Sequence, residues 1–322
     1  MNNLYLNSNG TLSRSENSLS FETDSRTIAY PIETTEAIYL FGETSLNTKL
    51  LNFCGQKRIP VHIFNHYGSH TGTFLPHAEQ ISGTLVVKQV KAFQSKEKRL
   101  TICRSLVSTA GFNMHYNLQR NARGCLEASQ IQELVRHLET ATSPEEIMGI
   151  EGAIRKIYYA RWQEWMGLDA TFRRDYKPPS NPLNALLSFL NSLLYTVVVT
   201  EIYRTGLYPG ISFLHSPQEK RISLALDLSE ITKPVIVDRM LARLFNTKAI
   251  GDADFIKDSN GVLLKDDSRK RVIQNWDEQI RTTVYYRHLK RNCSYRQIIR
   301  RDCYQLIRHL LENEPLRFFR LE

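Results

Sequence analysis

Residues 143–158 read SPEEIMGIEGAIRKIY, and this stretch opens a helix with one apolar face. Ser143 can cap the helix, Pro144 suits its first position, and Glu146 can complete a capping box. Four isoleucines follow at the spacing of a helix that packs against a core. The stretch therefore predicts a long amphipathic helix in a predominantly helical domain.

A single carboxylate, Glu151, interrupts the apolar face of this helix. A partly buried carboxylate is normally paired, protonated or bound to a metal ion. Gly149 and Gly152 flank it at a cost in helix stability, which suggests that something approaches the helix closely. Two interpretations stay open: Glu151 is a metal ligand, or it is a structural acid paired with Arg155 or Arg161.

The helical pattern extends over most of the chain beyond about residue 83. It recurs over residues 84–110, 127–139, 144–168, 183–205 and 276–312. Tyr176–Pro182 contains two adjacent prolines and a third soon after, so we expect an extended connector there. Gly251–Asp267 is polar and rich in glycine and aspartate, and we expect an exposed loop. Ser223 is a reasonable N-cap for a further helix.

The first eighty or so residues show short strand-like runs instead of helical periodicity. Short β-branched and aromatic runs at Thr27–Tyr30, Ala37–Leu40 and Val61–Phe64 predict strands. One short helix is expected at Ser45–Phe53, ended by Gly55. The predicted fold class is thus α+β, with a small N-terminal β domain over residues 1–82 and a larger all-α catalytic domain over residues 83–322.

The composition fits a soluble protein with an anionic partner. The chain has 322 residues, is 42% hydrophobic and 23% charged, and carries a formal net charge of +9. Ten Lys or Arg but only four acids lie between Arg281 and Glu322. The five cysteines are scattered and odd in number, which favours a reducing compartment over a disulfide framework. With no signal-peptide pattern and no apolar stretch judged long enough to span a bilayer, we expect a cytoplasmic protein that does not contact a membrane.

Two further polar features fall in the second half of the chain. His215 is bracketed by prolines and a glycine, which places it in a loop. Asp227 and Glu230 are three residues apart, so in a helix they share one face, and leucines beside that face draw it inward. Each feature has a structural alternative: a hydrogen-bonded structural histidine, and an ordinary solvated acidic face.

Taken together, the inward carboxylates and one imidazole predict a hard metal site. Mg²⁺ and Mn²⁺ both suit such ligands, and the imidazole favours Mn²⁺. Open coordination positions would admit water and a phosphate oxygen, as in-line attack on a phosphodiester requires. The sequence therefore predicts a metal-dependent enzyme acting on DNA phosphodiesters.

At this point the chain resembles a known family, the CRISPR-associated integrases, or "Cas-one" endonucleases of spacer acquisition. The likeness covers nearly the whole chain, and its order and spacing are more specific than any one motif. The matching stretches are Gly149–Gly152, Phe172–Arg174 through Lys177–Pro179 to Asn184–Phe189, Pro209–Gly210 to His215, and Leu224–Glu230 leading into Pro234–Arg239.

The resemblance implies a site, partners and a reaction. The family's metal ligands map onto Glu151, His215 and Glu230, and Asp227 matches a neighbouring acid that assists. The resemblance also implies a homodimer formed largely through the β domain, and a hetero-hexamer in which two dimers flank a central dimer of a small adaptation partner. The reaction would be attack by the 3′-hydroxyl of a protospacer DNA on the backbone of the repeat array, with hydrolytic nicking as the same chemistry by water.

The basic C-terminal region is a candidate DNA surface. Basic and aromatic side chains interleave along a predicted helix, which suits phosphate contact and base stacking. The alternative is a solvated basic face with tyrosines packed on the core. The candidate contacts here are Arg287, Lys290, Arg291, Tyr295 and Arg296, and Arg161, Arg173, Arg174 and Lys177 could extend the surface toward Glu151.

Two other function classes remain to be weighed. A catalytically silent DNA-binding scaffold would keep the fold and the basic surface, but it would be expected to lose at least one of the three ligand residues. A basic helical RNA-binding regulator would leave the inward acids unexplained.

Overall fold

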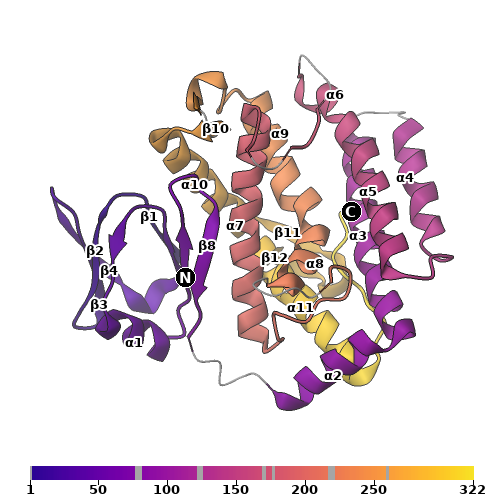
Figure 1. Ribbon diagram of the computed structural model, residues 1–322, viewed down its shortest axis with the longest axis horizontal. Coiled ribbons are helices and arrows are strands. Elements are labelled where there is room, and N and C mark those ends of the chain that lie inside the picture. Colours follow the sequence, from indigo (N-terminus) through magenta and orange to yellow (C-terminus); the bar gives the residue numbers. More distant parts are fainter. Residues whose placement is uncertain are drawn as a thin grey trace.

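The computed structural model describes residues 2–76, 82–121, 126–168, 172–175, 178–216, 222–258 and 261–322. A β-rich N-terminal part stands beside a larger, mainly helical part (Figure 1). The predicted α+β class and the order of its two parts are confirmed.

The N-terminal part is built from two four-stranded sheets. In the first, β1 (Asn2–Leu6), β5 (Thr35–Leu40) and β7 (Val61–Phe64) run parallel, and β8 (His70–Phe74) is antiparallel to β7. The second has the order β4 (Thr27–Pro31), β3 (Ser18–Glu22), β2 (Gly10–Ser15) and β6 (Thr44–Ser45). Leucines and isoleucines of this part, together with Phe53, form a separate small core. The three predicted strands are confirmed as β4, β5 and β7.

Helix α1 (Thr48–Gln56) begins and ends later than predicted. Asn47 caps it by accepting a hydrogen bond from the Leu50 amide at 2.9 Å, and Ser45 belongs to β6. Gly55 lies inside the helix, so the expectation that it ends the helix was wrong. The asparagine cap sets the start of the helix more strongly than the apolar pattern does.

The second part consists of packed helices. Its helices up to the site are α2 (Gly83–Gln94), α3 (Lys96–Asn121), α4 (Leu126–His137), α5 (Pro144–Ala160), α6 (Trp162–Met166), α7 (Pro182–Thr205) and α8 (Ser223–Thr232). The chain continues through a π-helical segment, η2 (Lys233–Asp238), into α9 (Arg239–Asn246), and later into α10 (Asp266–Arg281) and α11 (Tyr295–Glu312). The helical segments predicted over residues 84–205 are confirmed in kind, with breaks at Ser95 and Arg161.

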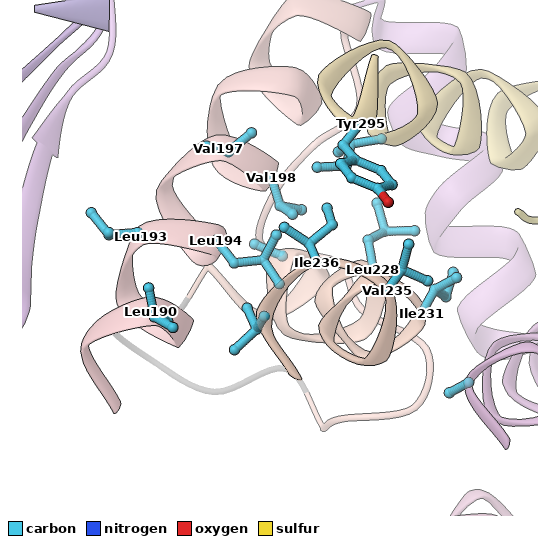
Figure 2. Close-up of a cluster of buried hydrophobic side chains, with 14 of the residues drawn as sticks. Leu190, Leu193, Leu194, Val197, Val198, Leu228, Ile231, Val235, Ile236 and Tyr295 are labelled. Atoms are coloured by element: carbon cyan, nitrogen blue, oxygen red, sulfur yellow. The ribbon is translucent and has the colours of Figure 1, made fainter. Parts of the chain in front are cut away.

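Helix α7 is the helix that stands next to the β part (Figure 1). It is the one helix of the described chain that could cross a membrane by length and composition, and 78% of its apolar window is buried inside the molecule. Figure 2 shows one side of this packing: Leu194 and Val198 point toward Ile236 of η2 and Tyr295, the first residue of α11. Packing within the domain therefore accounts for its apolar character.

Two predictions for the C-terminal third were wrong. Gly251–Asp267 is not an exposed loop: it contains a short 3₁₀ turn and the hairpin β9 (Phe255–Asp258) and β10 (Gly261–Leu264), with Phe255 and Val262 buried. Residues 276–312 are not one helix, because the hairpin β11 (Thr283–Tyr286) and β12 (Arg291–Ser294) separates α10 from α11. The C-terminal part is therefore mainly helical but not all-α.

The two parts are joined by buried polar contacts. Glu201 of α7 is fully buried and pairs with Arg300 and Arg296, and Arg296 also pairs with Glu36 of β5. His62 of β7 contacts Thr200 of α7 through Nε2 at 2.9 Å. Because burial without partners would be costly for these groups, the ion pairs fix the β part against the helical part.

Candidate metal and phosphodiester site

Helix α5 begins as its sequence predicts. Ser143 accepts a hydrogen bond from the Glu146 amide at 3.2 Å, with Pro144 at the first helical position. The Glu146 carboxylate accepts from the backbone amide of Thr142 at 2.6 Å, one residue before the predicted capping box. The cap fixes the register that turns Glu151 toward the core.

Glu151 and Glu230 converge on one cation. The Arg155 guanidinium pairs through Nε with Glu151, one helical turn earlier, and through Nη2 with Glu230 of α8. The Lys233 ammonium lies 2.6 Å from the other oxygen of Glu230. Glu230 is only 6% exposed and the Arg155 side chain 14%. Burial lowers the pKa of Arg155, but Glu151 and the Tyr159 hydroxyl outweigh it, so the pKa lies above its usual value.

Both interpretations of Glu151 thus keep support. The expected partner Arg155 is present, whereas Arg161 pairs with Glu164 and Glu127 instead. Glu230 belongs to the same ion-pair cluster through Arg155. It lies on α8, and only the tertiary fold brings it to α5.

The glycines beside Glu151 face open space. A Cβ atom at Gly149 or Gly152 would meet no atom within 4 Å beyond its own helical surroundings. The close approach that the sequence suggested is therefore not made by another described segment of this chain. The surface of α5 next to Glu151 therefore carries no side chain at Gly149 or Gly152.

The buried Asp227 carboxylate holds His215 in place. His215 Nδ1 lies 2.8 Å from Asp227 Oδ1, and the same carboxylate accepts hydrogen bonds from the backbone amides of Phe213, Leu214 and His215. Asp227 is fully buried, while the His215 side chain is 29% exposed. Nδ1 is then the donor to the carboxylate, and Nε2 is the nitrogen with a lone pair.

The beginning of the loop that carries His215 is also hydrogen-bonded to the start of α8. Ser223 is the first residue of α8 and donates from its hydroxyl to Gly210 O at 3.1 Å, so its predicted role as the N-cap was wrong. The Leu224 amide donates to Pro209 O at 3.1 Å. These bonds secure the loop that carries His215 against the start of the helix that carries Asp227 and Glu230.

Two polar residues near the site were not singled out from the sequence. Lys233 pairs with Glu230, and Asp238 is buried at the end of η2. Burial raises the pKa of Asp238 to about 7, against the opposing effects of Arg155 and a hydrogen bond with Tyr158. In the sequence, Asp238 directly follows the apolar run Pro234–Val237, and this pattern indicates a carboxylate that is directed into the protein.

The ligand types fit a divalent cation, although the described residues do not yet form a metal cluster. No group of three His, Cys, Asp or Glu side chains within the described ranges lies close enough to hold an ion. The structure brings Glu151 to Glu230 through Arg155, and His215 to Asp227. Asp227 and Glu230 lie one turn apart on α8, which links the two pairs.

The candidate DNA contacts near the C-terminus divide into two groups. Arg287, Lys290 and Arg291 are exposed, on the β11–β12 hairpin and the short turn between its strands rather than on a helix. Tyr295 is 4% exposed and lies in the core beside residues of α8 and η2 (Figure 2). Arg296 is 7% exposed in its ion pairs. The prediction that these last two contact DNA was wrong, because both side chains serve internal packing.

The other basic candidates also differ. Arg173 is exposed, but Arg174 donates to Asn184 and to Ser188 Oγ at 3.0 Å and so ties the connector to α7. Arg161 is partly exposed and ion-paired at the end of α5. Lys177 lies outside the described residues, as does Tyr176 of the expected connector.

The comparisons with known proteins agree over almost the full length. Residues 4–278 match the family model described as CRISPR associated protein Cas1. A protein from Fusobacterium nucleatum named CRISPR-associated endonuclease Cas1 is 41% identical, over 98% of this chain and 96% of its own. A solved Cas1 structure from Thermotoga maritima is 36% identical, with a TM-score of 0.89 and 99% of each chain covered.

More distant structures share the fold. A casposase bound to an integration product has a TM-score of 0.86 at 21% identity, covering 98% of this chain and 92% of its own. A Cas6-RT-Cas1–Cas2 complex chain has a TM-score of 0.85 at 18% identity, covering 99% of this chain and 36% of its own. The family model and the full-length relatives together show that this chain belongs to the CRISPR-associated Cas1 family.

Proposed function

We propose that this chain is a divalent-metal-dependent DNA endonuclease and integrase that inserts protospacer DNA into a CRISPR repeat array. The observation that carries the proposal is the convergence of Glu151 and Glu230 on a single cation, Arg155. Two carboxylates from different helices meet at one positively charged position, and Asp227, one turn before Glu230 on α8, orients a histidine. Relatives named endonuclease and a casposase with the same fold support the reaction class.

In this proposal Glu151, Glu230 and His215 Nε2 hold Mn²⁺ or Mg²⁺. Asp227 is a positioning residue: its hydrogen bond to Nδ1 fixes the tautomer and the ring orientation, as carboxylates behind metal-binding histidines do. A bound ion would offset the charge that develops on the phosphate and orient its oxygens.

The residues around the ligands are suited to a phosphodiester. Arg155 and Lys233 supply positive charge next to the carboxylates. In strand transfer the 3′-hydroxyl oxygen forms a bond to phosphorus while the bond to the leaving 3′-oxygen breaks. The attacking hydroxyl loses a proton and the leaving oxygen gains one, so one phosphodiester replaces another and no oxidant or cofactor turnover is needed. With water as the attacking group the same step is hydrolytic nicking.

The proposal includes a homodimer and a small partner protein. Strand β4 stands at the edge of its sheet and three of its five residues are exposed, so it offers a pairing surface in the predicted dimerisation domain, residues 1–82. A chain of the Cas6-RT-Cas1–Cas2 complex shares this fold, which supports a Cas2-type partner. The hetero-hexamer with that partner is part of the proposal. Light scattering of the chain alone, and with its partner, measures both assemblies.

A specific observation also favours a second candidate, the catalytically silent DNA-binding scaffold. Arg155 and Lys233 already neutralise Glu230, and the described side chains form no cluster of three ligands. A protein that used these acids only for internal ion pairing would show the same contacts.

Strand transfer separates the two candidates. A short DNA with free 3′ ends is incubated with a repeat-bearing plasmid, Mn²⁺ and the partner protein. His215→Ala and Glu151→Gln should lose at least about a hundredfold in rate, as loss of a metal ligand costs no less than loss of its supporting shell. His137→Ala and Glu133→Gln, both exposed on α4, are the matched controls and should keep wild-type activity.

Equal rates for His215→Ala and wild type would refute the metal-site assignment. No strand transfer and no nicking by the wild-type complex would favour the scaffold.

A further inference from the structure

Helix α3 supports both of the helices that carry the carboxylates proposed as metal ligands. It contacts α5, which carries Glu151, α8, which carries Glu230, and η2, which follows α8. In the helical part, α3 and α5 run side by side (Figure 1). Two asparagines of α3, Asn113 and Asn117, are one helical turn apart and only 0% and 1% exposed. A buried amide is costly unless it is hydrogen-bonded, and both of these bond to the ligand-bearing segments.

Asn117 bridges the segments that carry the two carboxylates. Its Nδ2 donates to the Tyr158 hydroxyl of α5 at 3.0 Å and to Pro234 O of η2 at 2.8 Å. Tyr158 lies seven residues after Glu151, two turns along the same face of α5. Pro234 lies four residues after Glu230, one turn along the chain. One carboxamide therefore joins α5 to η2 close to both proposed ligands.

Asn113 holds the turn that contains Glu230. Its Nδ2 donates at 3.1 Å to Ile231 O, the carbonyl of the residue after Glu230. The same nitrogen donates to Phe319 O at 3.2 Å, and its Oδ1 accepts from the Leu321 amide at 2.9 Å. The carboxamide is thus hydrogen-bonded through both its nitrogen and its oxygen. It fixes the last turn of α8 to α3 and to the segment that follows α11.

The backbone departs from a regular α-helix between these two contacts. The chain passes from α8 into the π-helical segment η2 at Lys233, and Pro234 has no amide to donate to the preceding turn. Short π-helical turns inside α-helices are frequent at functional sites. Buried carbonyls near such a break need donors from elsewhere in the protein. The two asparagines donate to one carbonyl before Lys233 and one after it.

The bridge through Asn117 does not depend on the ion pair between the helices. In the metal-free protein Arg155 joins Glu151 of α5 to Glu230 of α8. Arg155 must leave both carboxylates before they can hold an ion, so its link cannot then set the separation of the helices. The hydrogen bonds of Asn117 involve neither carboxylate, and they are free to stay in place.

We propose that Asn113 and Asn117 are positioning residues that set the separation of Glu151 and Glu230, and this rests on the proposed function. Their amides hold α5, the end of α8 and η2 on the common support of α3. Ligand side chains must be held within about 0.5 Å of their productive geometry by the groups around them. The two asparagines supply such support from a helix that carries none of the ligands, so less ordering is left to occur when an ion binds.

Mn²⁺ affinity, measured by isothermal titration calorimetry on the full chain, tests the proposal. Asn117→Leu keeps the approximate size of the side chain and removes both donated hydrogen bonds. Its Kd for Mn²⁺ should rise about 10- to 100-fold, the usual effect of losing a group that supports metal ligands. Asn113→Leu should raise the Kd in the same way. Thermal unfolding in EDTA measures the stability of each variant.

His115→Leu is the matched control. His115 is also buried on α3, between the two asparagines, but its Nδ1 bonds to Ala128 O of α4 at 2.8 Å and its Nε2 to Gln132 at 2.9 Å. Its replacement should lower the Tm in EDTA as Asn117→Leu does, because both leave a buried carbonyl without its donor. It should keep the wild-type Kd for Mn²⁺. A merely structural role of Asn117 would not separate Tm from Kd in this way.

Tyr158→Phe tests the same bridge with a smaller change in packing. It removes the α5 end of the bridge, while Asn117 keeps its hydrogen bond to Pro234 O. Its Kd for Mn²⁺ should rise, but by less than that of Asn117→Leu. Mn²⁺ affinities of Asn117→Leu and Tyr158→Phe equal to that of His115→Leu would overturn the proposal, and so would an unchanged affinity in Tyr158→Phe if Asn117→Leu does not fold.

Failure of the proposed function has a different signature. Strand transfer is measured for the wild type in the same Mn²⁺ buffer with the partner protein. If Asn117→Leu weakens Mn²⁺ binding but the wild type transfers no strand, the positioning role stands and the enzymatic proposal falls. If the wild type transfers strands and every variant keeps its Mn²⁺ affinity, the positioning role alone falls. A wild type that binds no Mn²⁺ overturns both.

Discussion

Replacement of Arg155 by glutamine should raise the affinity for Mn²⁺. In the metal-free protein the Arg155 guanidinium occupies the position on which Glu151 and Glu230 converge, so a metal ion must displace it. A hydrogen bond to a charged group contributes about 1.5 to 3 kcal/mol net. Removing this competitor should therefore tighten Mn²⁺ binding by roughly ten- to a hundredfold, at about 1.4 kcal/mol per factor of ten.

The same change should weaken the metal-free fold. Without Arg155 the two carboxylates lose their shared partner, and breaking a buried pair costs about 3 to 5 kcal/mol. Lys233 still pairs with Glu230, so the lower end applies. Mn²⁺ at a hundred times its Kd restores about 2.7 kcal/mol, and the increase in Tm on adding Mn²⁺ should be larger in the variant than in the wild type.

Isothermal titration calorimetry with Mn²⁺ and thermal unfolding with and without it are the assays. Arg136→Gln, an exposed position on α4, is the control and should match the wild type in both. Mn²⁺ affinity that is unchanged or weaker in Arg155→Gln would refute the reasoning, since Arg155 would then not compete for the carboxylates.

Four further outcomes follow from contacts elsewhere. Asp227→Asn should weaken Mn²⁺ binding about 10- to 100-fold by calorimetry, and unchanged affinity would remove Asp227 from its positioning role. Arg296→Ala, which leaves Glu36 and Glu201 short of a partner, should lower the free energy of unfolding in urea by on the order of 3 kcal/mol; an unchanged urea midpoint contradicts this. Tyr295→Ala should cost about 3 to 5 kcal/mol as a core deletion and leave the Kd for DNA unchanged, whereas a selective loss of DNA binding would restore its predicted DNA role. Burial raises the pKa of Asp302 from 3.8 to about 7, so the folded protein keeps a proton that the unfolded chain releases. The free energy of unfolding of the wild type, relative to that of Asp302→Asn, should therefore fall as pH rises from about 4 to 7. The fall should be at most about 4 kcal/mol, at 1.36 kcal/mol per pKa unit, and the difference should stay constant above pH 7. A difference that does not depend on pH contradicts the prediction.

The start of α5 and the inward direction of Glu151 were predictable because both are local. Ser143 and Pro144 set the helical register, and the isoleucines of the same helix define its buried face. The choice between a metal ligand and an ion pair was not predictable, because it depends on Glu230, which lies about eighty residues later in the chain. His215 and Asp227 were found as candidates, but only the folded loop shows that one carboxylate holds four donors.

The missed hairpins had sequence signals that the helical pattern concealed. Asn260–Gly261 is a typical hairpin dipeptide between two apolar runs, and Gly261 has a φ of +107°. Thr283–Tyr286 is rich in β-branched and aromatic residues, and the chain reverses near Lys290 with a φ of +50°. Because β12 ends at Ser294, α11 starts with Tyr295 and Arg296 directed inward, which no continuous helix through this region would predict.

The most direct measurement of the central claim is an anomalous diffraction map of crystals soaked in Mn²⁺. The account predicts one strong peak within coordination distance of Glu151, Glu230 and His215 Nε2, with Arg155 moved off the two carboxylates and Asp227 still on Nδ1. A peak held by other residues, or no peak among these three in crystals of a protein that is active with Mn²⁺, would contradict it.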